Sequence, residues 1–181
     1  MLNETQRETL LEVARKSLEA AVAGGETPRP EIDDPDLQRV QGAFVTLKKN
    51  GDLRGCIGNI VGRHPLVETV ANMAKAAALE DPRFPPVTES ELPQLHIEIS
   101  VMSPLREIDD TDEIEVGRHG LVISRGRNRG LLLPQVPGEW GWDREEFLQH
   151  TCMKANLPPD AWRDDETTIE VFEAEVFGEE T

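Results

Sequence analysis

A hairpin signal in the first half of the chain most strongly constrains the fold. Residues 41–49 have the composition of a strand, residues 53–60 have that of a second, and Asn50-Gly51-Asp52 between them is a typical tight-turn sequence. Residues 94–103 form a third candidate strand, because their aliphatic side chains fall at every second position. Strands joined by so short a turn pair antiparallel, since a parallel pair needs a long crossover. The sequence therefore predicts an antiparallel sheet.

Three helices are expected around these strands. Residues 5–23 open with the capping-box spacing Thr5-x-x-Glu8, place Leu, Ala and Val on one stripe, and end at two glycines. Residues 65–79 carry a second apolar stripe, and Asp143 is suited to cap a third helix that runs to about residue 156.

Two further strand signals follow in the second half of the chain. Residues 121–124 and 131–136 flank the turn sequence RGRNRG as a second hairpin, and residues 168–177 read as a final strand. Helices and strands do not alternate strictly along the chain, as they would in a doubly wound fold. The sequence therefore predicts an α+β fold with a mainly antiparallel sheet flanked by helices.

Length and composition indicate an ordinary globular protein. The chain has 181 residues, of which 38% are hydrophobic, and its formal net charge is −16. A chain of this length buries a sizeable core without disulfide or metal staples. We expect one domain over residues 5–177, built either as one lobe or with a smaller second lobe, and a short acidic tail at 178–181.

Several function classes lack their signals. The acidic balance argues against non-specific nucleic-acid binding, which depends on clustered Lys and Arg. No apolar run is long enough to span a membrane, and the first ten residues lack the pattern of a secretion signal, so we expect a cytoplasmic protein. Cys56 and Cys152 lie far apart and form no CxxC, and no phosphate-loop or Rossmann motif is present. We therefore expect neither a cofactor nor a metal site.

The hexapeptide LRGCIG, residues 53–58, carries the clearest candidate chemistry. In a strand, Arg54, Cys56 and Gly58 share one face, so the guanidinium can favour a thiolate and the glycine leaves room for a ligand or another backbone. On this interpretation Cys56 is a nucleophile or a ligand-contacting thiol. The alternative is a buried thiol in a strand whose glycines mark tight packing.

The loop DPRFPP, residues 81–86, follows the second predicted helix and offers two interpretations. Asp81 and Arg83 can line the same cleft as Cys56. Alternatively, the Asp-Pro pair ends the helix, Phe84 packs in the core and Arg83 pairs with a carboxylate.

The negative charge is unevenly distributed. Residues 107–116 and 160–181 together carry 14 of the 16 net negative charges, which leaves the LRGCIG region close to neutral. Residues 117–138 contain four arginines and no acid, and His119 lies beside an apolar run there. This arginine hairpin can bind an anion or an acidic partner, or it can be a solvated surface. The distribution leaves a small anionic ligand possible and extended nucleic acid disfavoured.

Six segments together resemble one known family. They are GAFVTLKK, LRGCIG, AAALEDPRFPPV, LHIEISVMSP, GRHGLVISRGRNRGLLLPQV and GWDREEFLQHTCMKA. The chain is similar over about residues 5–177 to the AMMECR family, whose bacterial and archaeal members are called AmmeMemoRadiSam system protein A and whose hallmark is LRGCIG. The resemblance implies an antiparallel α+β domain with a smaller second lobe. It also implies two partners, a Memo-like protein of the extradiol-dioxygenase fold and a radical SAM enzyme.

The motif positions carried over from this resemblance are 53–58, 81–84 and 130–136, which include Gly55 and Gln135. We expect a cytosolic ligand-binding or accessory protein that acts with the Memo-like and radical SAM partners through a cleft lined by Arg54, Cys56, Asp81 and Arg83. An alternative is an enzyme that uses Cys56 as an attacking thiol on a small anionic or acyl substrate, with His119 or His150 as the base. A third is a regulator of transcription or translation, a role suspected for a eukaryotic member, which would bind through the arginine hairpin.

Overall fold

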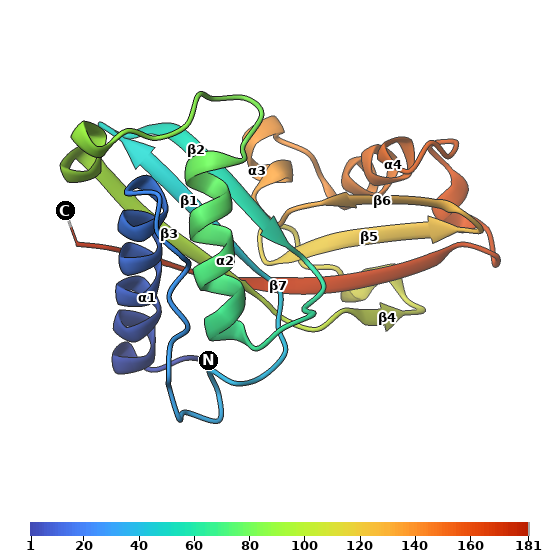
Figure 1. The fold of residues 1–181 in the computed structure, drawn as a ribbon. Coiled ribbons are helices and arrows are strands. Elements are labelled where there is room, and N and C mark those ends of the chain that lie inside the picture. The colour runs from blue at the N-terminus through green and yellow to red at the C-terminus, as the bar shows by residue number, and fades with distance from the viewer. Residues whose placement is uncertain (181) are drawn as a thin grey trace. The chain divides into compact units, whose positions relative to one another are not determined.

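The computed structural model describes residues 1–180, which divide into two compact units (Figure 1). The first unit comprises Met1–Met102 and the residues from Glu175 onward, and the second comprises Ser103–Ala174. Both units contain antiparallel strands flanked by helices, which confirms the predicted α+β class. None of the helices within residues 1–180 has the length and apolar character needed to cross a membrane.

The predicted hairpin is the centre of the first unit. Strand β1 (Ala43–Lys49) pairs with β2 (Asp52–Asn59) on one side and with β3 (Leu95–Met102) on the other, all antiparallel. The residues from Glu175 onward continue strand β7 (Thr168–Gly178) into this unit beside β3. The β1–β2 turn is made by Asn50 and Gly51, which have φ values of 54° and 85°. Two left-handed residues are what a type I′ hairpin turn requires, and Asn-Gly is its preferred sequence.

Two helices cover the apolar face of this sheet, as Figure 1 shows for α1 (Glu4–Val22) and α2 (Leu66–Leu79). The predicted cap at Thr5 is wrong: Asn3 caps α1, and its side chain and that of Gln6 each accept the other residue's backbone N–H. Asn is as strong a cap as Thr, and it lies two residues earlier. A 3₁₀ helix at Glu89–Gln94 then leads into β3.

The core of the first unit lies between the helices and one face of the sheet. It contains Leu10, Leu18, Val45, Ile97 and Ile99, none of which is exposed to solvent. The alternate residues of the strands therefore lie on the opposite face, where side chains are only half-buried. We call this second face the open face.

The acidic end of the chain is bound to the first unit. The Glu179 carboxylate lies 2.6 Å from Arg15 and accepts a hydrogen bond from the backbone N–H of Ile97. Glu175 pairs with Arg7 at the same distance. The predicted tail at 178–181 thus begins with the last residue of β7, and Thr181 lies outside the described residues.

The second unit has its own core. Strand β5 (His119–Arg125) pairs with β6 (Asn128–Leu132) and with β7, and the short strand β4 (Arg106–Ile108) also pairs with β7. Helix α4 (Arg144–Lys154) begins after its predicted cap Asp143 and packs on β5 and β6. The fully buried Cys152 lies in this core, four residues after Leu148, which is also buried.

The second hairpin differs from its prediction at its end. The strand expected at 131–136 stops at Leu132, and Val136 begins the short helix α3 (Val136–Trp140). Pro134 and Pro137 explain the change, because proline has no N–H for a strand ladder and is favoured in the first turn of a helix. Two short 3₁₀ helices, Thr111–Glu113 and Ala161–Arg163, complete this unit.

Candidate functional site

Cys56 lies on the open face of the first unit. In the β1–β2 register it is opposite Thr46, and its Sγ lies 3.2 Å from the Thr46 Oγ1, close enough for a hydrogen bond. Unlike the buried Cys152, Cys56 is partly accessible. No imidazole or carboxylate within residues 1–180 forms a hydrogen bond with this sulfur, so the thiol is held by a hydroxyl.

The open face continues from Cys56 across the neighbouring strands. Thr46 is opposite both Cys56 and Glu98, so these three residues form a row across β2, β1 and β3. The Glu98 carboxylate accepts a hydrogen bond from Lys48, with the two atoms 3.2 Å apart. Phe44 lies two residues before Thr46 on the same face and is also half-buried. The thiol is therefore part of a mixed polar and aromatic surface.

Asp81 and Arg83 close the outer edge of β2 beside Cys56. The buried Asp81 carboxylate accepts the backbone N–H of Cys56 at 3.0 Å, and Arg83 donates to the Cys56 carbonyl oxygen at 3.4 Å. The same guanidinium donates two hydrogen bonds to the Asp81 carboxylate, from its Nε at 3.0 Å and from its Nη2 at 2.8 Å. The Asp81–Arg83 pair therefore provides hydrogen-bond partners for the N–H and the carbonyl oxygen of Cys56, which would otherwise be unpaired at the edge of the sheet.

The pKa of the Asp81 carboxyl is held far below its ordinary value. The main cause is the hydrogen bond from Arg83, and the backbone N–H groups of Cys56 and Arg83 act in the same direction against the cost of burial. Asp81 is thus a fixed anion at neutral pH, and it cannot act there as a general acid.

Arg54 binds groups other than the thiol. Its Nε donates to Glu91 at 2.9 Å and its Nη2 donates to the carbonyl oxygen of Pro85 at 2.8 Å. Glu91 also binds Lys49, and its pKa is lowered to about 2, chiefly by the hydrogen bond from Arg54. The expected pairing of Arg54 with a Cys56 thiolate is therefore replaced by an ion pair with Glu91.

The Phe84 ring lies close to both arginines. The guanidinium carbon of Arg54 is 5.9 Å from the centroid of its ring and that of Arg83 is 5.5 Å from it. Both distances fit cation–π contacts. Asp81 and Arg83 thus lie beside Cys56, and Arg83 also pairs with a carboxylate, as the alternative interpretation of DPRFPP expects. Phe84 is only partly buried and is not part of either core, so that part of the alternative is wrong.

The two glycines of the hexapeptide permit close packing. A Cβ on Gly55 would collide with the carbonyl oxygen of Ala77 in α2, and one on Gly58 would collide with β1, at the Ala43 carbonyl oxygen and Phe44. The room predicted at Gly58 is therefore filled by β1 and the Phe44 side chain. Both glycines let the backbone of β2 approach its neighbours.

The remaining candidates belong to the second unit. His119 is buried, its Nδ1 accepts the backbone N–H of Glu115 at 3.0 Å, and its Nε2 lies 3.6 Å from Glu173. His150 stacks on Trp142, with ring centroids 3.8 Å apart. Gln135 is exposed and precedes α3. His119 and His150 are thus placed by contacts within the second unit.

The arginine hairpin is partly neutralised. Arg125 pairs with Asp164 at 2.6 Å, and Arg118 pairs with Glu115 and Glu173. Arg127 and Arg129, at the β5–β6 turn, are exposed. Among residues 1–180, no three His, Cys, Asp or Glu side chains are grouped so that they could hold a metal ion.

Sequence reasoning did not find Thr46, Glu98 or Glu91 as members of the site. Counting outward equally from the Asn50–Gly51 turn would place Thr46 opposite Gly55. An irregularity in the β1–β2 register at Leu47 and Lys48 shifts the pairing by one residue, so that Thr46 faces Cys56, and counting alone does not find it. Arg54 and Glu91 are 37 residues apart in the sequence, and Glu91 is one of many acids in the chain. No local pattern therefore identifies this ion pair.

These features define a class of two-unit α+β protein in which a thiol-bearing edge strand is closed by an Asp-Arg pair. The AMMECR1 family model matches residues 11–177, and the chain belongs to this family.

Archaeal relatives support the assignment over nearly the whole chain. A protein of Thermococcus onnurineus is 49% identical, with 96% of this chain and 90% of the relative covered. One from Methanothermobacter thermautotrophicus is 45% identical and covers 99% and 97%. The crystal structure of an uncharacterised protein from Pyrococcus horikoshii matches with a TM-score of 0.81 at 44% identity, over 94% of this chain and 90% of that one.

Proposed function

We propose that this protein is a cytoplasmic accessory or ligand-binding component that acts with a Memo-like protein and a radical SAM protein. Its binding surface is the open face around Cys56, formed by Phe44, Thr46, Cys56 and Glu98. The partners are those that the resemblance of the sequence implies.

The observation that best supports this proposal is that both arginines of the site form ion pairs with carboxylates of the same unit. Arg54 is bound to Glu91 and Arg83 to Asp81, so both cations are engaged in holding β2 and its flanking loop in place. A strand fixed in this way presents a rigid surface, and rigid surfaces lose little conformational entropy on binding. This favours recognition as the task of the region.

The test is association of the purified chain with the two partner proteins. A Glu98→Lys substitution reverses a charge on the open face, and we expect it to weaken binding by about tenfold or more. Glu8→Lys makes the same charge change on the exposed side of α1 and is the matched control. Association that is absent in the unmodified protein, or equal in both variants, contradicts the proposal.

A thiol nucleophile is the second candidate, and the accessible Cys56 Sγ beside the Thr46 hydroxyl is the observation that favours it. An activated thiol reacts with iodoacetamide faster than cysteine in an unstructured peptide at the same pH. Cys152 supplies an internal control, because burial raises the pKa of its thiol. A Cys56→Ser protein should therefore stay unlabelled. A Cys56 rate no higher than that of the peptide contradicts this candidate.

A further inference from the structure

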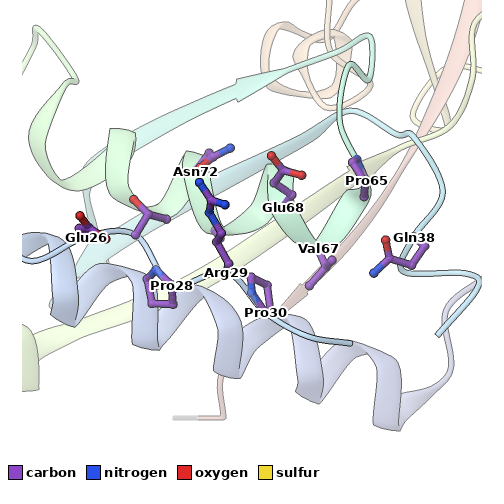
Figure 2. Close-up of a pocket in the computed structure, with 11 residues that line it drawn as sticks. Glu26, Pro28, Arg29, Pro30, Gln38, Pro65, Val67, Glu68 and Asn72 are labelled. Atoms are coloured by element: carbon purple, nitrogen blue, oxygen red, sulfur yellow. The ribbon is translucent and has the colours of Figure 1, made fainter. Parts of the chain in front are cut away.

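A second site lies away from Cys56, in a pocket of about 650 Å³ between the loop after α1 and helix α2 (Figure 2). Pro28, Arg29 and Pro30 form its loop side, and Val67, Glu68 and Asn72 form its helix side. This volume is typical of sites for small molecules. We call it the α2 pocket.

The backbone around the α2 pocket is held in place. The loop leaves α1 through Gly24 and Gly25, whose N–H groups bind carbonyl oxygens of the last helical turn, and the prolines flanking Arg29 restrict the chain further. At the other end, the carbonyl oxygens of Leu37 and Arg39 accept the first N–H groups of α2. These contacts fix both ends of the segment that borders the pocket, and these N–H groups are not available to a ligand.

Arg29 supplies an available cation. Arg39 pairs with Asp36 and Arg54 with Glu91, whereas no carboxylate within residues 1–180 lies at ion-pair distance from the Arg29 guanidinium. Figure 2 shows the Arg29 side chain reaching from the loop toward Asn72 on α2. A guanidinium beside a side-chain amide is suited to bind a carboxylate, because both present N–H donors.

Glu68 supplies the opposite charge. It precedes Asn72 by four residues and so lies on the same side of α2. The Nδ1 of His64 lies 3.8 Å from its carboxylate, and the Glu68 side chain is 53% exposed. With Glu26 also lining the pocket, two acids face one arginine. This balance disfavours a polyanion such as a nucleotide and favours a ligand that carries an ammonium group as well as a carboxylate.

We propose that the α2 pocket binds a small zwitterion, either a free amino acid or a short peptide with free ends. Arg29 and Asn72 hold the carboxylate, Glu68 holds the ammonium group, and the Pro28 and Pro30 rings contact an aliphatic side chain. This site is independent of the Cys56 surface, so either proposal can fail without the other.

Calorimetric titration with L-leucine and with the dipeptide leucyl-leucine tests the proposal. We expect saturable binding of at least one, with the tighter one distinguishing a free amino acid from a peptide. The same titration with 4-methylpentanoate, which lacks the ammonium group, and with isoamylamine, which lacks the carboxylate, should give about tenfold weaker binding or none.

Two exposed substitutions connect the binding to the pocket. Arg29→Gln and Glu68→Gln should each weaken leucine or dipeptide binding by about tenfold, because each removes one charged contact. Arg127→Gln and Glu166→Gln make the same changes at exposed positions of the second unit, and binding should remain unchanged. Absence of saturable binding of both zwitterions overturns the proposal, as does equal binding by the pocket variants and their controls.

Discussion

Single carboxylates position the residues around the thiol. Asp81 is buried and accepts hydrogen bonds from two backbone N–H groups and from the Arg83 guanidinium. Glu91 plays the same part for Arg54 and Lys49. The arginines of the site are thus effective in holding the strand because each has a fixed anion beside it.

Asp81→Asn should destabilise the protein by about 2 kcal/mol, because the neutral amide loses charge-assisted bonds and presents an N–H group to other donors. Urea unfolding measures the change. Arg83→Gln is the comparison and should cost less, since the Arg83 side chain is 55% exposed. An Asp81→Asn protein as stable as the unmodified one contradicts this role of the carboxylate.

Because the pKa of Glu91 is lowered in the folded protein, we expect the free energy of unfolding to decrease in acid. Its pKa falls from an ordinary value of 4.5 to about 2 on folding, so between these pH values the unfolded chain binds more protons than the folded one. The contribution of Glu91 to the free energy of unfolding is complete above pH 4.5 and is lost as the pH falls toward 2.

Urea unfolding across this pH range, compared between the unmodified protein and Glu91→Gln, isolates the contribution. The stability difference between the two proteins should shrink as the pH falls. A difference that stays constant shows that the Glu91 carboxylate is not held by Arg54 in solution.

The sequence predicts the identity of many site residues better than their partners. The juxtaposition of Cys56 with Asp81 and Arg83 was one of two open interpretations, and the structure places these residues together. The sequence does not identify the partner of Arg54. A guanidinium can bind any acid within reach, and the chain holds 35 Asp and Glu residues, so tertiary structure selects the partner.

At the scale of elements, the edge strand β2 is closed on two sides. The Asp81–Arg83 pair satisfies its outer edge at Cys56, and α2 packs directly on its backbone at Gly55. An exposed strand edge is otherwise a template for unwanted pairing. The close approach of α2 to β2 thus explains why LRGCIG has a glycine at position 55.

Gly55→Ala should destabilise the protein by about 1–3 kcal/mol, because the added methyl group collides with the Ala77 carbonyl oxygen and α2 must shift. Thermal and urea unfolding both report the loss. Gly138→Ala is the matched control, since a Cβ there meets no atom within 4 Å. Equal stability of the two variants contradicts the close approach of α2 to β2.

Elements with strong local signals were predicted well, and those decided by proline or tertiary pairing were not. The Asn50-Gly51 turn and the Asp143 cap occur where their side-chain chemistry indicates. The three-residue strand β4 has no periodicity long enough to recognise, and it exists because Arg106–Ile108 pairs with β7. Pro134 ended a strand that hydrophobicity alone would have extended.

At the scale of the whole molecule, strand β7 connects two units with separate cores. Residues 107–116 lie in the second unit, and the acidic segment 160–181 runs from that unit into the first. The open face of the first unit, by contrast, carries both positive and negative side chains, as the Lys48–Glu98 pair shows. Such a surface suits a partner with matched polar and apolar groups better than a polyanion.

Alkylation of Cys56 with and without the two partner proteins tests the proposed surface most directly. Iodoacetamide labelling, followed by mass spectrometry of the peptide containing Cys56, reports whether that thiol is covered. We expect labelling to slow by about tenfold or more when the partners are bound. A complex that forms while Cys56 reacts at its original rate would show that the open face is not the binding surface.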